Sequence, residues 1–215
     1  NFPVEKTAVF LNVTEEMLAD VAQAASFINE DLAYQVQAKE DEFLLNGSGS
    51  SEITGILNTS GIQTLSGAVN TVDKIKAAIA YVEGANGSGF AMPDAILMNP
   101  LDWLSISLSK DNNGQYLFGG PGYAPYGVGG YSNMSQMWGL NVVTTRFIAQ
   151  GTAIVGAFKQ GATLYRRAGL TIRSTDSHAS NFIANIVTVL AESRFALAVK
   201  QPNKFCTITG IPAAA

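Results

Sequence analysis

The sequence predicts an α+β protein, and three patterns along the chain support this class. Apolar residues recur at helical spacings over residues 17–46. Between residues 71 and 109, patterns typical of a helix, a strand and another helix follow one another. From residue 140 onwards, short apolar runs predict several strands, so the second half of the chain is expected to be mainly β.

The first helix is expected to pack on a sheet through one apolar stripe. The stripe residues, at spacings of four, four and seven, are Ile28, Leu32, Val36 and Phe43. Asn46-Gly47 ends the pattern, and we expect Gly47 to adopt the left-handed conformation that glycine provides at helix ends. The consecutive acids Glu40, Asp41 and Glu42 point around a helix rather than toward one metal, so they predict a solvated face.

The central part of the chain carries start and stop signals for two further helices. Thr71 is a suitable N-cap for a helix that Gly84 ends. Its apolar seam consists of Val72, Ile75, Ile79 and Val82. Residues 95–98 form a short apolar strand, and Asn99-Pro100 then provides an N-cap and a first-turn proline for a helix through about Ser109.

Further extended segments are expected along the chain. Besides residues 95–98, the predicted strands are residues 1–13, 115–118, 140–145, 153–158, 163–167, 170–174 and 181–200. Both faces of residues 181–200 are largely apolar, which predicts a central strand covered on both sides. At about 3.3 Å per residue this strand is long enough to link two lobes. Glu192 and Arg194 share one of its faces and are expected to pair.

Charge is scarce for a chain of 215 residues. Only 14% of the residues are charged, whereas an average globular domain has about 25%. The net charge of −4 and the scattered cations argue against a nucleic-acid reader. No apolar run reaches the ~18 residues of a membrane span. We therefore expect other protein subunits to cover much of the surface, and the single cysteine, Cys206, fits a reducing compartment.

A glycine-rich segment with three tyrosines is the clearest loop in the sequence. Residues 119–133 contain Tyr123, Tyr126 and Tyr131. The composition is too flexible for a core and too aromatic for an inert linker, which indicates either a loop that contacts a neighbouring subunit or a plain surface loop.

Catalytic and metal-binding patterns are scarce in this chain. His178 is the only histidine, which excludes sites that need two imidazoles. An α+β enzyme that uses Asp102, Lys110 or Glu192 in a cleft is a remote alternative, because these residues do not supply a nucleophile, a base and an orienting group. We expect no enzyme activity, no cofactor and no metal.

Five strings in order resemble one family of proteins. They are FINEDLAYQVQAKEDEFLLNGSG (27–49), ILMNPLDW (96–103), KDNNGQYLFGGP (110–121), MWGLNVVTT (137–145) and NFIANIVTVLAESRFALAV (181–199). Each string alone is weak, but their order is specific. The chain resembles the major capsid proteins of tailed bacteriophages with the HK97 fold over nearly all of its length.

The resemblance implies a peripheral and an axial domain. Residues 1–65 and 161–200 would form the peripheral domain with the end of the extended loop, and residues 66–160 and 201–215 the axial domain. It implies self-assembly into hexamers and pentamers of an icosahedral shell that encloses double-stranded DNA, in the virion, after assembly in the host cytoplasm. Scaffolding, portal and decoration proteins are possible further partners, without any membrane. An encapsulin-like bacterial compartment shares the fold and is the alternative.

The resemblance also suggests candidate contact and cross-link residues. Some family members join neighbouring subunits through a lysine and an asparagine, assisted by a glutamate, and Asn185 and Glu192 occupy matching positions. In the opposing interpretation, Asn185 serves packing or hydrogen bonding and Glu192 pairs with Arg194. Together with the three loop tyrosines, Phe10 is a candidate for the subunit interface.

Overall fold

The computed structural model describes most of the chain. The described residues are 3–20, 24–50, 52–66, 70–84, 87, 90–110, 113–114, 136–178 and 181–211. The predicted strand 115–118 and the glycine-rich segment 119–133 lie outside them. The chain divides into two compact units, of which unit 1 comprises residues 1–58 and 164–198 and unit 2 residues 59–163 and 199–215.

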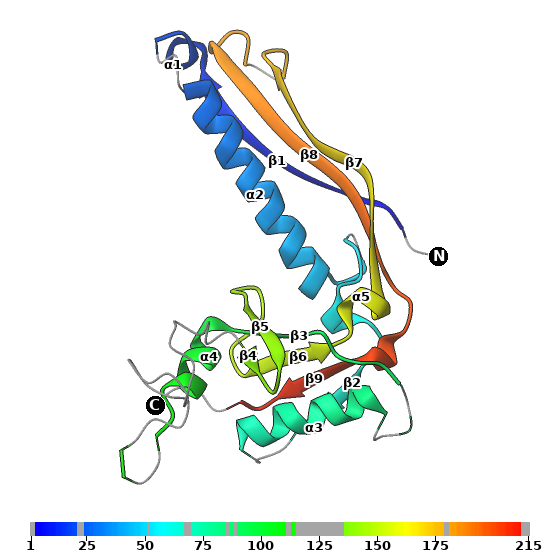
Figure 1. Ribbon diagram of the computed structural model, residues 1–215. Helices are drawn as coiled ribbons and strands as arrows, with labels where there is room; N and C mark the ends of the chain where they lie inside the picture. The colour runs from blue at the N-terminus through cyan, green and yellow to red at the C-terminus, as the bar shows by residue number, and fades with distance from the viewer. Residues whose placement is uncertain are drawn as a thin grey trace. The chain divides into compact units, whose positions relative to one another are not determined.

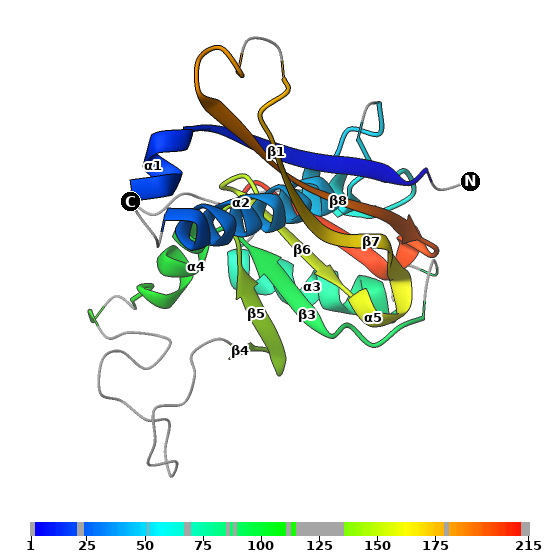
Figure 2. The ribbon, with the colours of Figure 1, turned by 90° about the horizontal axis from the view of Figure 1, so that it is seen from above.

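Unit 1 is a three-stranded sheet with helices on one side. The strand order is β1 (Glu5–Thr14), β8 (Ile186–Val199) and β7 (Ala162–Thr175). β1 runs antiparallel to β8, with Phe10 opposite Leu190. The helical pattern forms two helices, α1 (Glu15–Asp20) and α2 (Ala24–Asn46), and α2 follows the sheet along its length (Figures 1 and 2).

The predicted apolar stripe forms the core of unit 1. Ile28, Leu32 and Val36 of α2 are buried against side chains of the sheet. Their buried partners are Val13, Val189 and Ala191, with Val9, Val187 and Ile172 partly buried beside them. The expectation that this helix packs on a sheet is confirmed.

Gly47 ends α2 for a different reason from the predicted one. Its φ is not among the positive values that the structure records for glycines such as Gly49 and Gly84, so the left-handed cap is wrong. Instead the chain turns back, and the Gly55 amide donates to the Gly47 carbonyl at 2.9 Å. A Cβ on Gly47 would overlap the Ile53 carbonyl oxygen and lie 2.6 Å from that of Phe43. Glycine is needed there because two backbone segments touch.

The long strands of unit 1 differ from their predicted lengths. Residues 163–167 and 170–174 belong to one 14-residue strand, β7, because Ala168 and Gly169 continue the extended backbone. The predicted strand 181–200 is shorter, since β8 begins at Ile186 and residues 181–185 form a turn. Asn185 in that turn has a φ of 53°, a left-handed conformation that a continuous strand does not contain.

Unit 2 contains a six-stranded mixed sheet. Its order is β2 (Gln63–Leu65), β9 (Phe205–Thr209), β6 (Thr152–Gly156), β3 (Ala95–Met98), β5 (Leu140–Thr144) and β4 (Gln136–Met137). The pairs β2–β9 and β3–β5 are parallel, and the others are antiparallel. The helical elements of the two units also include α3 (Thr71–Glu83), α4 (Pro100–Ser107), α5 (Phe158–Gly161), η1 (Ile56–Asn58) and η2 (Pro202–Lys204).

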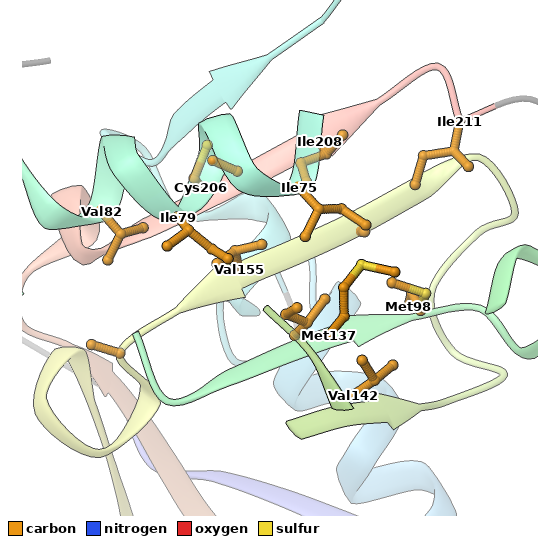
Figure 3. Close-up of a cluster of buried hydrophobic side chains, with 14 of the residues drawn as sticks. Ile75, Ile79, Val82, Met98, Met137, Val142, Val155, Cys206, Ile208 and Ile211 are labelled. Carbon is orange, nitrogen blue, oxygen red and sulfur yellow. The ribbon is translucent and has the colours of Figure 1, made fainter. Parts of the chain in front are cut away.

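The core of unit 2 lies between α3 and this sheet (Figure 3). The predicted seam residues Ile75, Ile79 and Val82 are buried there, and Val72 is partly buried. Cys206 of β9 lies in the same core, and burial raises the pKa of its thiol to about 11. The thiol is therefore a packing group at neutral pH.

Most of the predicted helix ends in unit 2 are confirmed. Gly84 caps α3 with a φ of 109°, and the Asn99 side chain accepts from the Leu101 amide at 3.0 Å at the start of α4. Asn70 rather than Thr71 is the N-cap of α3, so the predicted start is wrong by one position. In the described part of the chain, no helix is long and apolar enough to cross a membrane.

The contact at Gly47 leads to a prediction about stability. Gly47→Ala should lower the free energy of unfolding by about 1–3 kcal/mol, because the new methyl group displaces backbone carbonyls. Gly169→Ala is the matched control in the same unit, since a Cβ there has nothing within 4 Å. Urea unfolding measures both variants, and equal stabilities would contradict the explanation.

Candidate assembly surfaces

Glu40 links α2 by side-chain hydrogen bonds to two strands of the sheet in unit 1. Its side chain is only 5% exposed. The Ser193 hydroxyl of β8 donates to Glu40 Oε1 at 2.6 Å, and Arg166 Nη2 of β7 donates to Oε2 at 2.7 Å. The carboxylate thus receives a neutral and a charged donor, which compensates for its burial.

The prediction of a solvated face at residues 40–42 is wrong for Glu40. The residues Ile28, Leu32 and Val36 face the sheet at spacings of four, and position 40 is the next in that series. Asp41 lies on the outside, and Glu42 forms an ion pair with Lys39 at 2.7 Å near the surface. Desolvation, followed by the charge of Glu40, raises the pKa of Asp41, and Arg166 partly opposes this shift.

Glu192 lies on the face of the sheet that points away from α2. It forms an ion pair with Lys6 of β1 at 3.3 Å, so the predicted pair with Arg194 is wrong. The antiparallel register places Lys6 opposite Arg194 and Ala8 opposite Glu192. Lys6 is therefore a diagonal neighbour of Glu192 across the two strands, and its long side chain spans the separation of about 7–8 Å that is typical of such neighbours.

Asn185 precedes the strand on which it was expected. Its backbone carbonyl accepts from the Glu15 amide at 2.9 Å, and its side chain is exposed. The left-handed backbone at Asn185 means that strand alternation does not determine where it points relative to Glu192. The described contacts do not join these two residues; Glu192 contacts Lys6 instead.

The turn before β8 presents apolar side chains that the sequence reading missed. Phe182 is 75% exposed and Ile183 88% exposed, although both fall in a run that was assigned to a covered strand. Two side-chain hydrogen bonds hold the turn on the sheet. Asn181 Nδ2 donates to Thr188 Oγ1 at 2.6 Å, and Thr188 Oγ1 donates to Asn12 Oδ1 at 2.7 Å. An Asn at each end of the turn is the one sequence signal for it.

Phe10, one of the interface candidates, is 66% exposed on β1. The others, Tyr123, Tyr126 and Tyr131, lie outside the described residues. A single exposed apolar side chain is common on protein surfaces, and an interaction site is indicated only where several of them gather. The exposure of Phe10 leaves it accessible for a subunit contact.

The residues of the remote enzyme alternative are divided between the two units. Asp102 and Lys110 belong to unit 2, and Glu192 belongs to unit 1. Asp102 is fully buried, accepts from the Gly151 amide at 2.8 Å, and holds a loop rather than facing solvent. Burial raises the pKa of Asp102, and the hydrogen bond from Gly151 partly opposes this. Where the chain is described, no cluster of metal-binding side chains is found.

The sequence and the fold of the chain match those of known proteins. Residues 1–210 match the model of the phage capsid family. The chain belongs to this family. The major capsid protein of Enterobacteria phage HK97 is 32% identical over 209 residues, which are 93% of this chain and 50% of that protein. The chain thus spans about half the length of this phage capsid relative.

Solved structures confirm the predicted α+β, HK97-like capsid fold. A structure described as the capsid of a native GTA particle matches with a TM-score of 0.76 and 16% identity, over 98% of this chain and 74% of that chain. A structure from Gordonia phage Cozz matches with a TM-score of 0.72 and 18% identity, over 97% of this chain and 70% of that chain. At these identities the likeness concerns the fold.

The two partners of the Glu40–Arg166 ion pair should differ in how much stability is lost when each is replaced. Arg166→Ala leaves a buried carboxylate with one neutral donor and should lower the free energy of unfolding by about 1–3 kcal/mol. Glu40→Gln leaves only a half-exposed arginine without its partner, so it should cost less. Chemical denaturation measures both. A larger loss for Glu40→Gln than for Arg166→Ala would contradict this account of the site.

Proposed function

We propose that the full-length protein is a major capsid protein. Its copies would form hexamers and pentamers of an icosahedral shell around double-stranded viral DNA, with the virion as its location and the host cytoplasm as the place of assembly. The observation that carries this proposal is the family match over residues 1–210. Its role would be structural rather than enzymatic.

The surface chemistry supports assembly from many modest contacts. Large apolar side chains are exposed in both units, including Phe10, Phe182 and Ile183 in unit 1 and Phe90 and Met92 in unit 2. Contacts that are weak singly and strong together allow misplaced subunits to dissociate during assembly. The acidic net charge of −4 suits an inner wall that does not bind DNA tightly.

We assign unit 1 to the peripheral domain and unit 2 to the axial domain. The long helix α2 and the long strands β7 and β8 lie in unit 1, as expected for a peripheral domain. The mixed sheet and α3 lie in unit 2. Scaffolding, portal and decoration proteins would be the further partners of such a shell.

An encapsulin-like compartment is the alternative for the same fold. A structure described as a virus-like particle from Pyrococcus furiosus matches with a TM-score of 0.61 and 15% identity, over 96% of this chain and 76% of that chain. The two functions differ in their content. A viral shell contains nucleic acid, whereas a compartment contains cargo protein.

Electron microscopy of the purified full-length protein tests the assembly function. We expect uniform closed shells, and we expect Phe10→Glu to abolish them without changing the thermal unfolding midpoint, because residue 10 is exposed and a buried carboxylate at a contact is costly. Phe10→Tyr is the matched control and should assemble. A small homogeneous species under all conditions, from the unaltered full-length protein, would contradict the proposal.

We also propose Asn185 and Glu192 as cross-link residues. A neutral lysine amine of a neighbouring copy would attack the Asn185 side-chain carbonyl carbon, a new C–N bond would form, and ammonia would leave. Glu192 would accept the proton that the amine loses and return it to the departing amide nitrogen, which leaves as ammonia. The exposed side chain of Asn185 supports this proposal, whereas the Lys6–Glu192 ion pair favours a purely structural role for Glu192.

A denaturing gel of intact particles decides between these roles. Covalent joining should give a ladder of multimers that Asn185→Ala removes and whose formation Glu192→Gln slows by at least about a hundredfold, the lower end of the usual contribution of a proton-transferring group. Asn29→Ala, at an exposed position on α2, serves as a control for loss of an amide elsewhere. Monomers from unaltered particles would contradict covalent joining and leave the assembly function intact.

A further inference from the structure

The sheet of unit 1 has one face that no described helix of that unit covers. Side chains of a strand alternate between two faces, and those that pack with α2 have been identified by their contacts: Val9, Val13, Ile172, Val189 and Ala191. The alternate positions point the other way, and we call this side the open face. It carries Lys6, Phe10, Tyr165, Arg167, Arg173 and Arg194.

The assignment to the open face is supported by contacts across the strands. Lys6 of β1 pairs with Glu192 of β8, and Asn12 of β1 bonds to Thr188 of β8, on the side away from α2. On β7, Arg166 reaches Glu40 of α2, so its neighbours Tyr165 and Arg167 point to the other side.

The open face is basic, although the chain is acidic. Lys6, Arg167, Arg173 and Arg194 are exposed there, against the single carboxylate of Glu192. Among the described residues, Glu192 is paired with Lys6, and no ion pair is formed by the three arginines. The whole chain has a net charge of −4, so the residues outside the open face carry more negative than positive charge.

The open face also carries apolar side chains, and side-chain hydrogen bonds join two of its strands. Phe10 is 66% exposed and Tyr165 51% exposed, and Leu190 lies opposite Phe10 on the central strand. The hydrogen bonds from Asn181 to Thr188 and from Thr188 to Asn12 tie β8 to β1 and to the turn that precedes it. Aromatic and arginine side chains on a preorganised surface are typical of protein interfaces.

We propose that the open face binds an acidic segment of a second copy of this chain. The proposal rests on the proposed assembly function and states which surface and which charges the contact uses. Charge complementarity favours a copy over a basic partner, since the rest of the chain supplies carboxylates for the three arginines, which form no described ion pair. Arginine is well suited to this contact because its planar group binds carboxylates with two hydrogen bonds.

Zero-length cross-linking of particles assembled from the full-length protein tests whether a second copy of the chain lies on the open face. Particles are assembled from an equal mixture of ¹⁵N-labelled and unlabelled chains, treated with a carbodiimide and digested for mass spectrometry. Lys6, with a side chain 50% exposed, should give linked peptide pairs that contain one labelled and one unlabelled chain. If all Lys6 links join peptides of the same labelling, as the Lys6–Glu192 pair would within one chain, the proposal is overturned.

Charge reversal tests the contribution of the arginines. Arg167→Glu with Arg173→Glu should reduce the yield of shells at least about tenfold, since like charges at a contact repel each other. The unfolding midpoint should not fall, because both side chains are exposed. Lys159→Glu with Lys76→Glu in unit 2 is the control with the same change in charge and should assemble.

The outcomes separate this inference from the function on which it rests. Normal assembly of the double arginine variant would overturn the role of the open face but not the capsid function. Binding of labelled DNA to the open face of intact subunits, lost in the same variant, would replace the second copy with nucleic acid and also overturn the inference. Failure of the unaltered full-length protein to form shells would overturn both.

Discussion

One helix packed on one face of a long sheet is the constraint on which unit 1 depends. The stripe of α2 residues at spacings of four supplies the apolar contact, and Glu40 adds a buried carboxylate that bonds to Ser193 of β8 and Arg166 of β7. The apolar contacts give affinity without a fixed register. The carboxylate gives the register, because its two donors lie on different strands.

This arrangement leaves the second face of the sheet without a cover inside the unit. In most antiparallel sheets a solvated face is polar. Here it combines exposed aromatic side chains with arginines that have no described ion pair, while residues with charge make up only 14% of the chain. Under the proposed assembly, burial by other subunits would account for both the scarcity of charge and the uncovered face. Membership of the phage capsid family agrees with that explanation.

Local signals predicted the parts of the fold that local interactions determine. The start of α4 follows from Asn99-Pro100, and Gly84 ends α3 where its left-handed conformation is required. Features that depend on distant residues were missed. The need for glycine at position 47 depends on the close approach of Ile53, and the burial of Glu40 depends on its donors on β7 and β8. The partner of Glu192 depends on the register of β1. The apolar run at Phe182 and Ile183 predicts a strand, and it does not reveal the turn that the hydrogen bond from Asn181 to Thr188 stabilises.

Burial of the open face by other copies of the chain would shield its strands from solvent. Hydrogen–deuterium exchange of the full-length protein, compared between assembled shells and dissociated subunits, measures this burial along each strand. We expect slower exchange in shells for peptides covering β1 and β7, the two outer strands of the sheet, and little change for the buried part of α3. Equal exchange of β1 and β7 in shells and free subunits would contradict burial of the open face.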